Sequence, residues 1–194
     1  MVSDMIPNLE DKDASVRLEA VLYVGNYVRL DEDALKAISK IGELALGDEE
    51  WRIRKEAIRV IARVLEAKKD ALDELTVYNN WTGKHYTMRK HILDVLEDAL
   101  EDVMPAVRSA AAQALGFVDE SSRDDAIYLL LKALRDVDSD VRSAAARALG
   151  RIGDQSVLGE LSRLAFNPNE EEMTATDAFC SFRRIIRRMS ASNS

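Results

Sequence analysis

A short pattern occurs four times in this chain and constrains its fold more than any other feature. Each copy begins with Asp, has an apolar residue five positions later, and continues with Arg. A fixed internal repeat of this kind predicts a solenoid, in which each unit packs against its neighbours. The four Asp–Arg pairs are Asp11 and Arg17, Asp48 and Arg54, Asp102 and Arg108, and Asp136 and Arg142.

Each unit is predicted to hold two helices. The first helix ends alike in three units, for example as Ala133-Leu134-Arg135-Asp136. After each arginine, small or apolar residues follow three and seven positions on, as Ala145 and Leu149 follow Arg142. Because these positions share one helical face, the second helices are expected to approach closely. A degenerate fifth unit follows, with Met173-Thr174 in place of the apolar residue and Arg, as expected of a terminal cap.

The best-preserved copies resemble the HEAT repeat. Residues 102–116 and 136–150 share the pattern Asp-x-x-x-x-Val-Arg-x-x-Ala-Ala-x-Ala-Leu-Gly, which is similar to the short HEAT-like repeats of phycobilisome lyases. The resemblance is tight over about 93–166, looser over 5–66, and lost between about 67 and 92.

The resemblance implies an all-α, right-handed α-solenoid, an α-α superhelix of about five helical pairs without strands. In that family the second helices line the concave face, and the repeated Asp and Arg form a ladder between neighbouring units. We therefore assign Arg17, Arg54, Arg108 and Arg142 to structure rather than to a ligand.

The whole chain, residues 1–194, is expected to form one repeat domain. An irregular insert interrupts it at about 67–92, and a degenerate C-terminal capping repeat occupies about 154–190. No apolar run is long enough to cross a bilayer and the start of the chain lacks a secretion signal, so we expect a cytoplasmic protein. Cys180, the single cysteine, is predicted to be a buried, inert thiol in the last helix.

One stripe of the second helices carries an unusual set of charges. Positions one, five and nine after each repeated arginine share a face, and none of them is acidic, although the formal net charge is −8. The stripe is either a ligand surface or a solvated face whose arginines pair with acids such as Glu56 and Glu66. The partner-binding candidates on it are Lys55, Arg59, Arg63, Gln113, Phe117, Arg147, Arg151 and Arg183.

The insert is the second candidate surface. Residues 75–90 are predicted to form a loop, or a helix end followed by a loop, because Asn79-Asn80 and Thr82-Gly83 break the helical pattern. Loops on repeat scaffolds often add specificity, but aromatic side chains here could instead cover the core. The secondary candidates are Tyr78, Trp81, His85 and Tyr86.

The residues favour no catalytic site, metal or cofactor. His85 and His91 are six positions apart and neither precedes Glu, whereas HEAT-repeat deoxyhypusine hydroxylases carry iron on His-Glu pairs. No glycine-rich phosphate loop is present, since Gly25, Gly116 and Gly150 fit helix ends or close helix packing.

Three functions remain open from the sequence. The leading hypothesis is a non-catalytic scaffold or adaptor that binds an acidic partner protein on its concave face, as a monomer or a weak dimer held by its ends. The second is nucleic-acid binding, as in HEAT-like DNA glycosylases, although an isoelectric point near 4.9 opposes it. The third is a bilin or cofactor lyase or chaperone, which only the repeat resemblance supports.

Overall fold

The computed structural model of the chain describes residues 2–27, 32–68, 72, 76–79 and 84–192. Its helices come in pairs, and the two members of a pair are joined by a short turn and pack on each other. The first unit consists of α1 (Val2–Met5), the 3-10 turn η1 (Pro7–Glu10) and α2 (Ala14–Tyr27). The other pairs are α3 (Glu32–Gly47) with α4 (Trp51–Lys68), α5 (Met88–Ala99) with α6 (Pro105–Leu115), α7 (Arg123–Ala133) with α8 (Ser139–Ile152), and α9 (Leu158–Ala165) with α10 (Glu172–Ser192).

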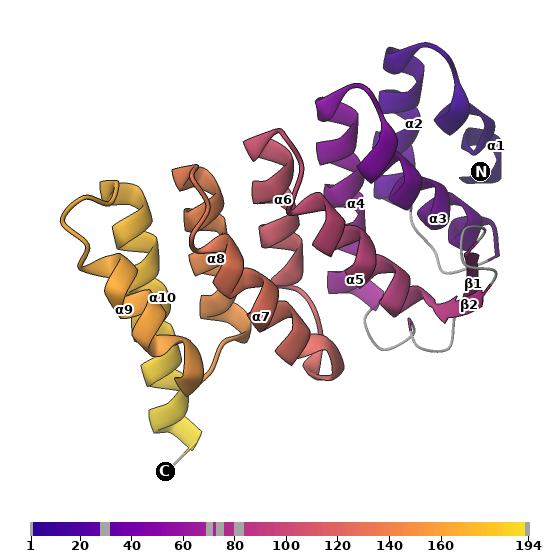
Figure 1. Cartoon of the computed structure of the whole chain (residues 1–194). Helices are drawn as coiled ribbons and strands as arrows, with labels where there is room; N and C mark the ends of the chain where they lie inside the picture. Colours follow the sequence, from indigo (N-terminus) through magenta and orange to yellow (C-terminus); the bar gives the residue numbers. More distant parts are fainter. Residues whose placement is uncertain (1, 28–31, 69–71, 73–75, 80–83, 193–194) are drawn as a thin grey trace.

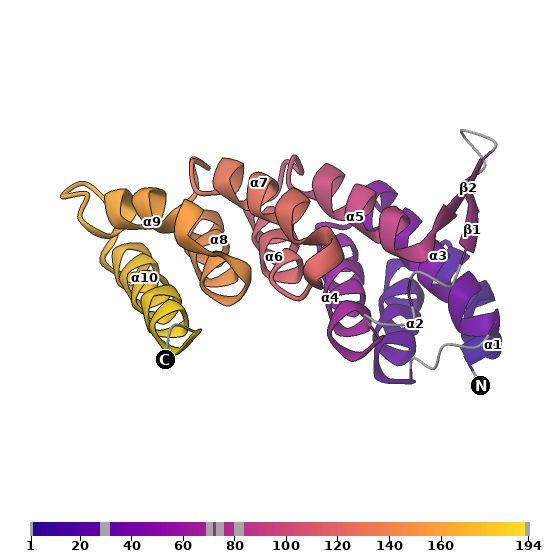
Figure 2. The ribbon, with the colours of Figure 1, turned by 90° about the horizontal axis from the view of Figure 1, so that it is seen from below.

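The pairs stack into a two-layered solenoid. One layer holds the second helices α2, α4, α6, α8 and α10, each of which packs against the next. Figures 1 and 2 show the first helices α3, α5, α7 and α9 as the other layer, with the two termini at opposite ends of the stack. The predicted helical solenoid is therefore confirmed.

Small residues let the second helices approach one another closely. Ala111 and Ala145 are fully buried, as the repeat alignment predicts. A Cβ added at Gly116 would stand 3.1 Å from the Cα of Ala148, and one at Gly150 would stand 2.5 Å from the Ser181 Oγ. A methyl group at Gly150 would therefore collide with α10, and one at Gly116 would press tightly against α8.

The insert forms a β-hairpin, so the expectations of a loop and of a strand-free chain were wrong. β1 (Thr76–Asn79) and β2 (Lys84–Thr87) pair antiparallel, with Tyr78 opposite His85 and Val77 opposite Tyr86. Both segments are rich in β-branched and aromatic residues, which favour strands. At the end of β2 the Thr87 side chain accepts a hydrogen bond from the Lys90 amide at 3.2 Å and caps the start of α5.

Candidate functional site

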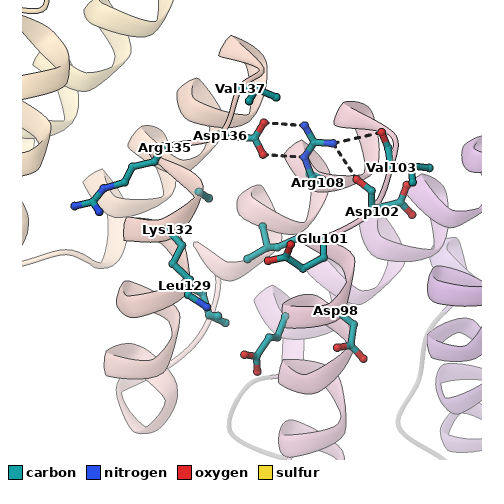
Figure 3. A pocket seen from close by; sticks show the side chains of 13 residues that line it. Asp98, Glu101, Asp102, Val103, Arg108, Leu129, Lys132, Arg135, Asp136 and Val137 are labelled. Carbon is teal, nitrogen blue, oxygen red and sulfur yellow. Dashed lines mark hydrogen bonds and ion pairs between the residues drawn. The ribbon is translucent and has the colours of Figure 1, made fainter.

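The repeated Asp and Arg form a ladder that joins successive units (Figure 3). Arg108 donates from Nε and Nη2 to the Asp136 carboxylate at 2.8 and 2.7 Å. Its Nη1 donates to the carbonyl oxygens of Asp102 and Val103 at 2.9 and 3.4 Å. One guanidinium therefore holds its own turn and the turn of the next unit together.

The same geometry recurs along the chain. Arg17 binds Asp48 at 2.7 and 2.9 Å, and Arg54 binds Asp102 at 2.6 and 2.9 Å. In the fifth unit Glu170 takes the place of Asp and pairs with Arg142. The assignment of these arginines to structure is confirmed, while Glu170 escaped sequence reasoning because the repeat pattern is degenerate there.

Each ladder aspartate also holds the turn that starts the following helix. The Asp102 Oδ1 accepts from the Met104 amide at 2.8 Å, and the Asp136 Oδ1 accepts from the Asp138 amide at 2.9 Å. Burial raises the pKa of Asp102, but the hydrogen bonds from Arg54 and the Met104 amide outweigh it and leave the pKa below its ordinary value. The ladder is therefore ionised at neutral pH.

The second-helix stripe is exposed along much of its length. Arg59, Arg63, Gln113, Arg147 and Arg151 are exposed, while Lys55 and Phe117 are partly buried. The Lys55 Nζ lies 5.2 Å from the centroid of the Trp51 ring. Most of the stripe on α4, α6 and α8 is thus available to solvent, but Ser143, its first position on α8, is buried.

Two arginines of the stripe already have acidic partners. Arg59 pairs with Glu56 at 2.6 Å, three residues earlier on the same helix. Arg147 pairs with Asp177 of α10 at 3.1 Å, and the Ser143 hydroxyl donates to the same carboxylate. The structure therefore brings an acid to a stripe that contains none in sequence, and part of its charge is internally neutralised.

Arg63 and Arg151 lie differently, because each reaches across to a residue of another unit that carries no charge. The Arg63 Nη1 is 3.5 Å from the Asn26 Oδ1 of α2. The guanidinium carbon of Arg151 is 4.5 Å from the centroid of the Phe117 ring, at the end of α6. Within the described residues neither arginine forms an ion pair, so each can accept a carboxylate from outside.

The fifth unit is displaced by one residue from the register that the sequence predicted. Thr174 is buried as Val141 is, so Thr174 and not Met173 occupies the apolar position. In this register Phe179 and Arg183 fall on the side of α10 that faces away from α8, and Arg183 is not in line with the other arginines. Cys180 is exposed, which corrects the expectation of a buried thiol.

Of the insert candidates, Tyr78, His85 and Tyr86 lie in the hairpin strands, and Trp81 lies outside the described residues. His91 is in α5, where its Nε2 is buried without a hydrogen-bond partner and would stand 2.9 Å from a Cβ at Gly42. Burial lowers the pKa of His91, which favours the neutral imidazole. His91 thus belongs to the packing of α5 on α3.

A groove of about 640 Å³ runs between α5 and α7 beside the ladder. Its α5 side is acidic, with Glu97, Asp98 and Glu101 exposed, and its α7 side carries Lys132 and Arg135 (Figure 3). Val103 and Val137, the residues that follow two ladder aspartates, are 84% and 93% exposed at its edge. The groove is a second concave feature, which sequence reasoning missed because it lies between two units.

Comparisons with known proteins agree with this architecture. Residues 92–178 match the family model for HEAT repeats. An engineered protein of known structure is similar with a TM-score of 0.64 and 21% identity, over 96% of this chain and 79% of that one. A designed armadillo repeat protein in complex with the peptide (KR)4 is similar with a TM-score of 0.66 and 19% identity, over 95% and 81%.

A computationally designed armadillo repeat protein for modular peptide recognition is also similar, with a TM-score of 0.63 and 18% identity, over 95% and 82%. At these identities the likeness shows the fold alone. The comparison with curated protein sequences finds no match. Among the described residues, no helix has the length and apolar character that a bilayer crossing needs. The chain is therefore a helical repeat solenoid, and its residues 92–178 match the model for HEAT repeats.

Proposed function

We propose that this protein is a non-catalytic adaptor of the cytoplasm that binds an acidic segment of a partner protein along its second-helix face. The observation that carries the proposal is the pair Arg63 and Arg151. Both guanidinium groups are exposed and lie without an acidic partner among the described residues, in a chain with eight more acidic than basic side chains. In an acidic protein, unpaired cations on one face favour an acidic ligand over a basic one.

The surroundings of these two arginines favour a peptide as the ligand. Phe117 lies under Arg151 and holds the guanidinium plane by a cation–π contact, which leaves the outer N–H groups for a carboxylate. Gln113 of the intervening helix α6 is exposed and offers an amide to a peptide backbone. The face thus combines charged and neutral hydrogen-bonding groups along several units.

The designed armadillo protein in the comparison carries the basic peptide (KR)4, and this gives a direct experimental contrast. An acidic fluorescent peptide made of four Asp-Glu pairs should bind the chain, and (KR)4 should not. The affinity for the acidic peptide should fall moderately with salt, because few ion pairs form. A single-stranded oligonucleotide that binds more tightly, with a steep log-linear salt dependence, would favour the nucleic-acid alternative instead.

The decisive variant is Arg63→Glu together with Arg151→Glu. It should weaken binding of the acidic peptide by about tenfold or more, which corresponds to about 1.4 kcal/mol. The matched control is Lys132→Glu with Arg135→Glu, which changes the net charge equally but acts at the C-terminal end of α7 and the turn after it, in the other layer. Equal losses in both variants would mean that only overall charge matters and would contradict the proposed surface.

A third variant separates the second-helix face from the insert. Replacing Trp81 and Tyr86 with Ala should leave peptide binding unchanged if the arginine face is the binding surface. If that variant abolishes binding while the arginine reversal does not, the ligand binds the insert at residues 75–90 and the proposal is wrong.

A further inference from the structure

The two ends of the solenoid present different surfaces. At the C-terminal end, the side of α10 that faces away from α8 carries Phe179, Arg183 and Ile186. Phe179 and Ile186 are each 39% exposed. Phe166, which follows α9 and is 69% exposed, meets Phe179 edge to face at a centroid distance of 6.0 Å. These side chains place exposed aromatic and aliphatic surface next to each other on the fifth unit.

The side of α2 that faces away from α4 is more exposed than the same side of α6 and α8. Val16 of α2 is partly exposed, whereas its counterparts Ile53, Val107 and Val141 are buried. Glu19 is exposed at a position where α6 and α8 carry the buried alanines Ala110 and Ala144. The outward side of α2 therefore offers an apolar residue and a carboxylate next to each other.

The charges of the two ends are complementary. Arg183 and Arg187 are exposed on α10 and form no ion pair within the part of the chain that the structure describes. Arg183 lies 5.8 Å from the centroid of the Phe179 ring, so the cation and the aromatic patch belong to one surface. Two C-terminal ends placed together would bring arginine to arginine, whereas a C-terminal end on an N-terminal end would bring Arg183 to the side of α2 where Glu19 is exposed.

We propose that the protein self-associates head to tail, with the C-terminal end of one copy docked on the outward side of α2 of the next. The occupant of the aromatic patch is thus a second copy, and Arg183 pairs with its Glu19. A head-to-tail contact leaves one free end on each side, so it produces short open chains rather than a closed dimer. This inference does not depend on the proposed peptide-binding function.

The contact is expected to be weak. Inside the solenoid, α8 presents Gly150 and the buried Ala146 to α10, and a Cβ at Gly150 would collide with Ser181. In the register of the fifth unit the same positions of α10 carry Arg183 and Phe179. Their larger side chains prevent another helix from approaching as closely as α10 approaches α8, so less surface is buried than at an internal junction.

Sedimentation velocity of the full chain, from about 10 µM to about 1 mM protein, tests the proposal at low and high salt. The weight-average sedimentation coefficient should rise continuously with concentration at low salt and rise less at high salt, because the contact includes an ion pair. A chain that stays monomeric over this range at low salt, or that forms one fixed closed oligomer, would overturn it.

Charge-swap variants test the pairing itself. Arg183→Glu alone and Glu19→Arg alone should each raise the dissociation constant about threefold to tenfold. The double variant with both changes restores opposite charges across a head-to-tail contact and should recover most of the association. A contact between two C-terminal ends predicts no recovery, because the double variant would behave like Arg183→Glu.

Arg135→Glu is the matched control, since it reverses an exposed arginine on the flank of the stack and should leave association unchanged. Thermal melting and circular dichroism establish that each variant is folded as the original chain is. Two outcomes would refute the pairing of Arg183 with Glu19. One is that the single variants are folded and associate as strongly as the original chain; the other is that the double variant is folded but does not recover the association.

Discussion

Arg108 and Asp136 lie 28 residues apart in the chain and are joined by two hydrogen bonds of 2.8 and 2.7 Å, one from each of two guanidinium nitrogens. Their side chains are only 12% and 13% exposed. The pair is therefore shielded from water, and each partner would be left without its counter-charge if the other were removed.

Replacing Arg108 with Ala should lower the free energy of unfolding by about 2–4 kcal/mol, because Asp136 and two backbone carbonyls lose their donor. Urea denaturation measures the change. Arg135→Ala, at a 69% exposed side chain, should change stability by less than about 0.5 kcal/mol. A loss for Arg108→Ala no larger than that control would show that the ladder does not stabilise the junction.

Acid should weaken the ladder. The pKa values of Asp48, Asp102 and Asp136 lie below the ordinary value of an aspartate. Burial raises these pKa values, but hydrogen bonds from the arginines and from backbone amides lower them by more than burial raises them. A lowered folded pKa stabilises the protein above the unfolded carboxyl value of about 3.9, and this stabilisation disappears as the pH falls through the folded value. The free energy of unfolding should therefore decline below about pH 4.

Denaturation curves between about pH 2 and pH 7 test this dependence. Asp102→Asn removes one ladder carboxylate. The free energy of unfolding of this variant should therefore be lower at every pH and should change less with pH in the acid range. If the variant and the original chain lose stability in parallel below pH 4, the ladder carboxylates do not cause the acid sensitivity.

Two glycines form a matched pair for the packing of the second helices. Gly150→Ala should destabilise the chain by about 1–3 kcal/mol, because the new Cβ would meet Ser181 at 2.5 Å. At Gly159→Ala, in α9, the new Cβ meets no atom within 4 Å apart from its chain neighbours and the backbone of its own helix, so the change should stabilise the chain by about 0.4–1 kcal/mol. The melting temperatures of both variants test this prediction. Equal changes in melting temperature would mean that helix propensity alone governs both sites.

His91 should make stability depend on pH near neutrality. Its folded pKa is lowered by burial, which the charges of Asp94 and Glu43 offset only in part. Above about pH 6.5 the His91 imidazole is neutral in both the folded and the unfolded chain, so it costs no stability there. As the pH falls below this value, the unfolded chain binds a proton at His91 before the folded chain does, and the free energy of unfolding decreases.

His91→Gln should remove this decrease between about pH 5 and pH 6.5, as seen in melting temperatures across the range. His85→Gln, in β2, is the comparison variant with the same chemical change. A pH dependence that persists in His91→Gln but vanishes in His85→Gln would assign the effect to the hairpin histidine.

Much of the architecture followed from the sequence because the repeat is local and periodic. The spacing of Asp11 and Arg17, repeated three more times, determined four of the five units and the faces of their second helices. A residue's neighbours within its own helix, such as Glu56 beside Arg59, were accessible in the same way. Each of these relations joins residues a few positions apart, where helical geometry alone sets the distance.

The relations that only the tertiary structure decided join residues of different units, or of units that depart from the repeat. Asp177 reaches Arg147 in the register of α10 that buries Thr174, which differs by one residue from the predicted register. The groove between α5 and α7 exists only when both helices are in place. The sequence by itself determined a solenoid with basic positions on one face. Which of those positions remain unpaired depended on the packing of one unit on the next, and that packing follows from side-chain volume and contact rather than from periodicity.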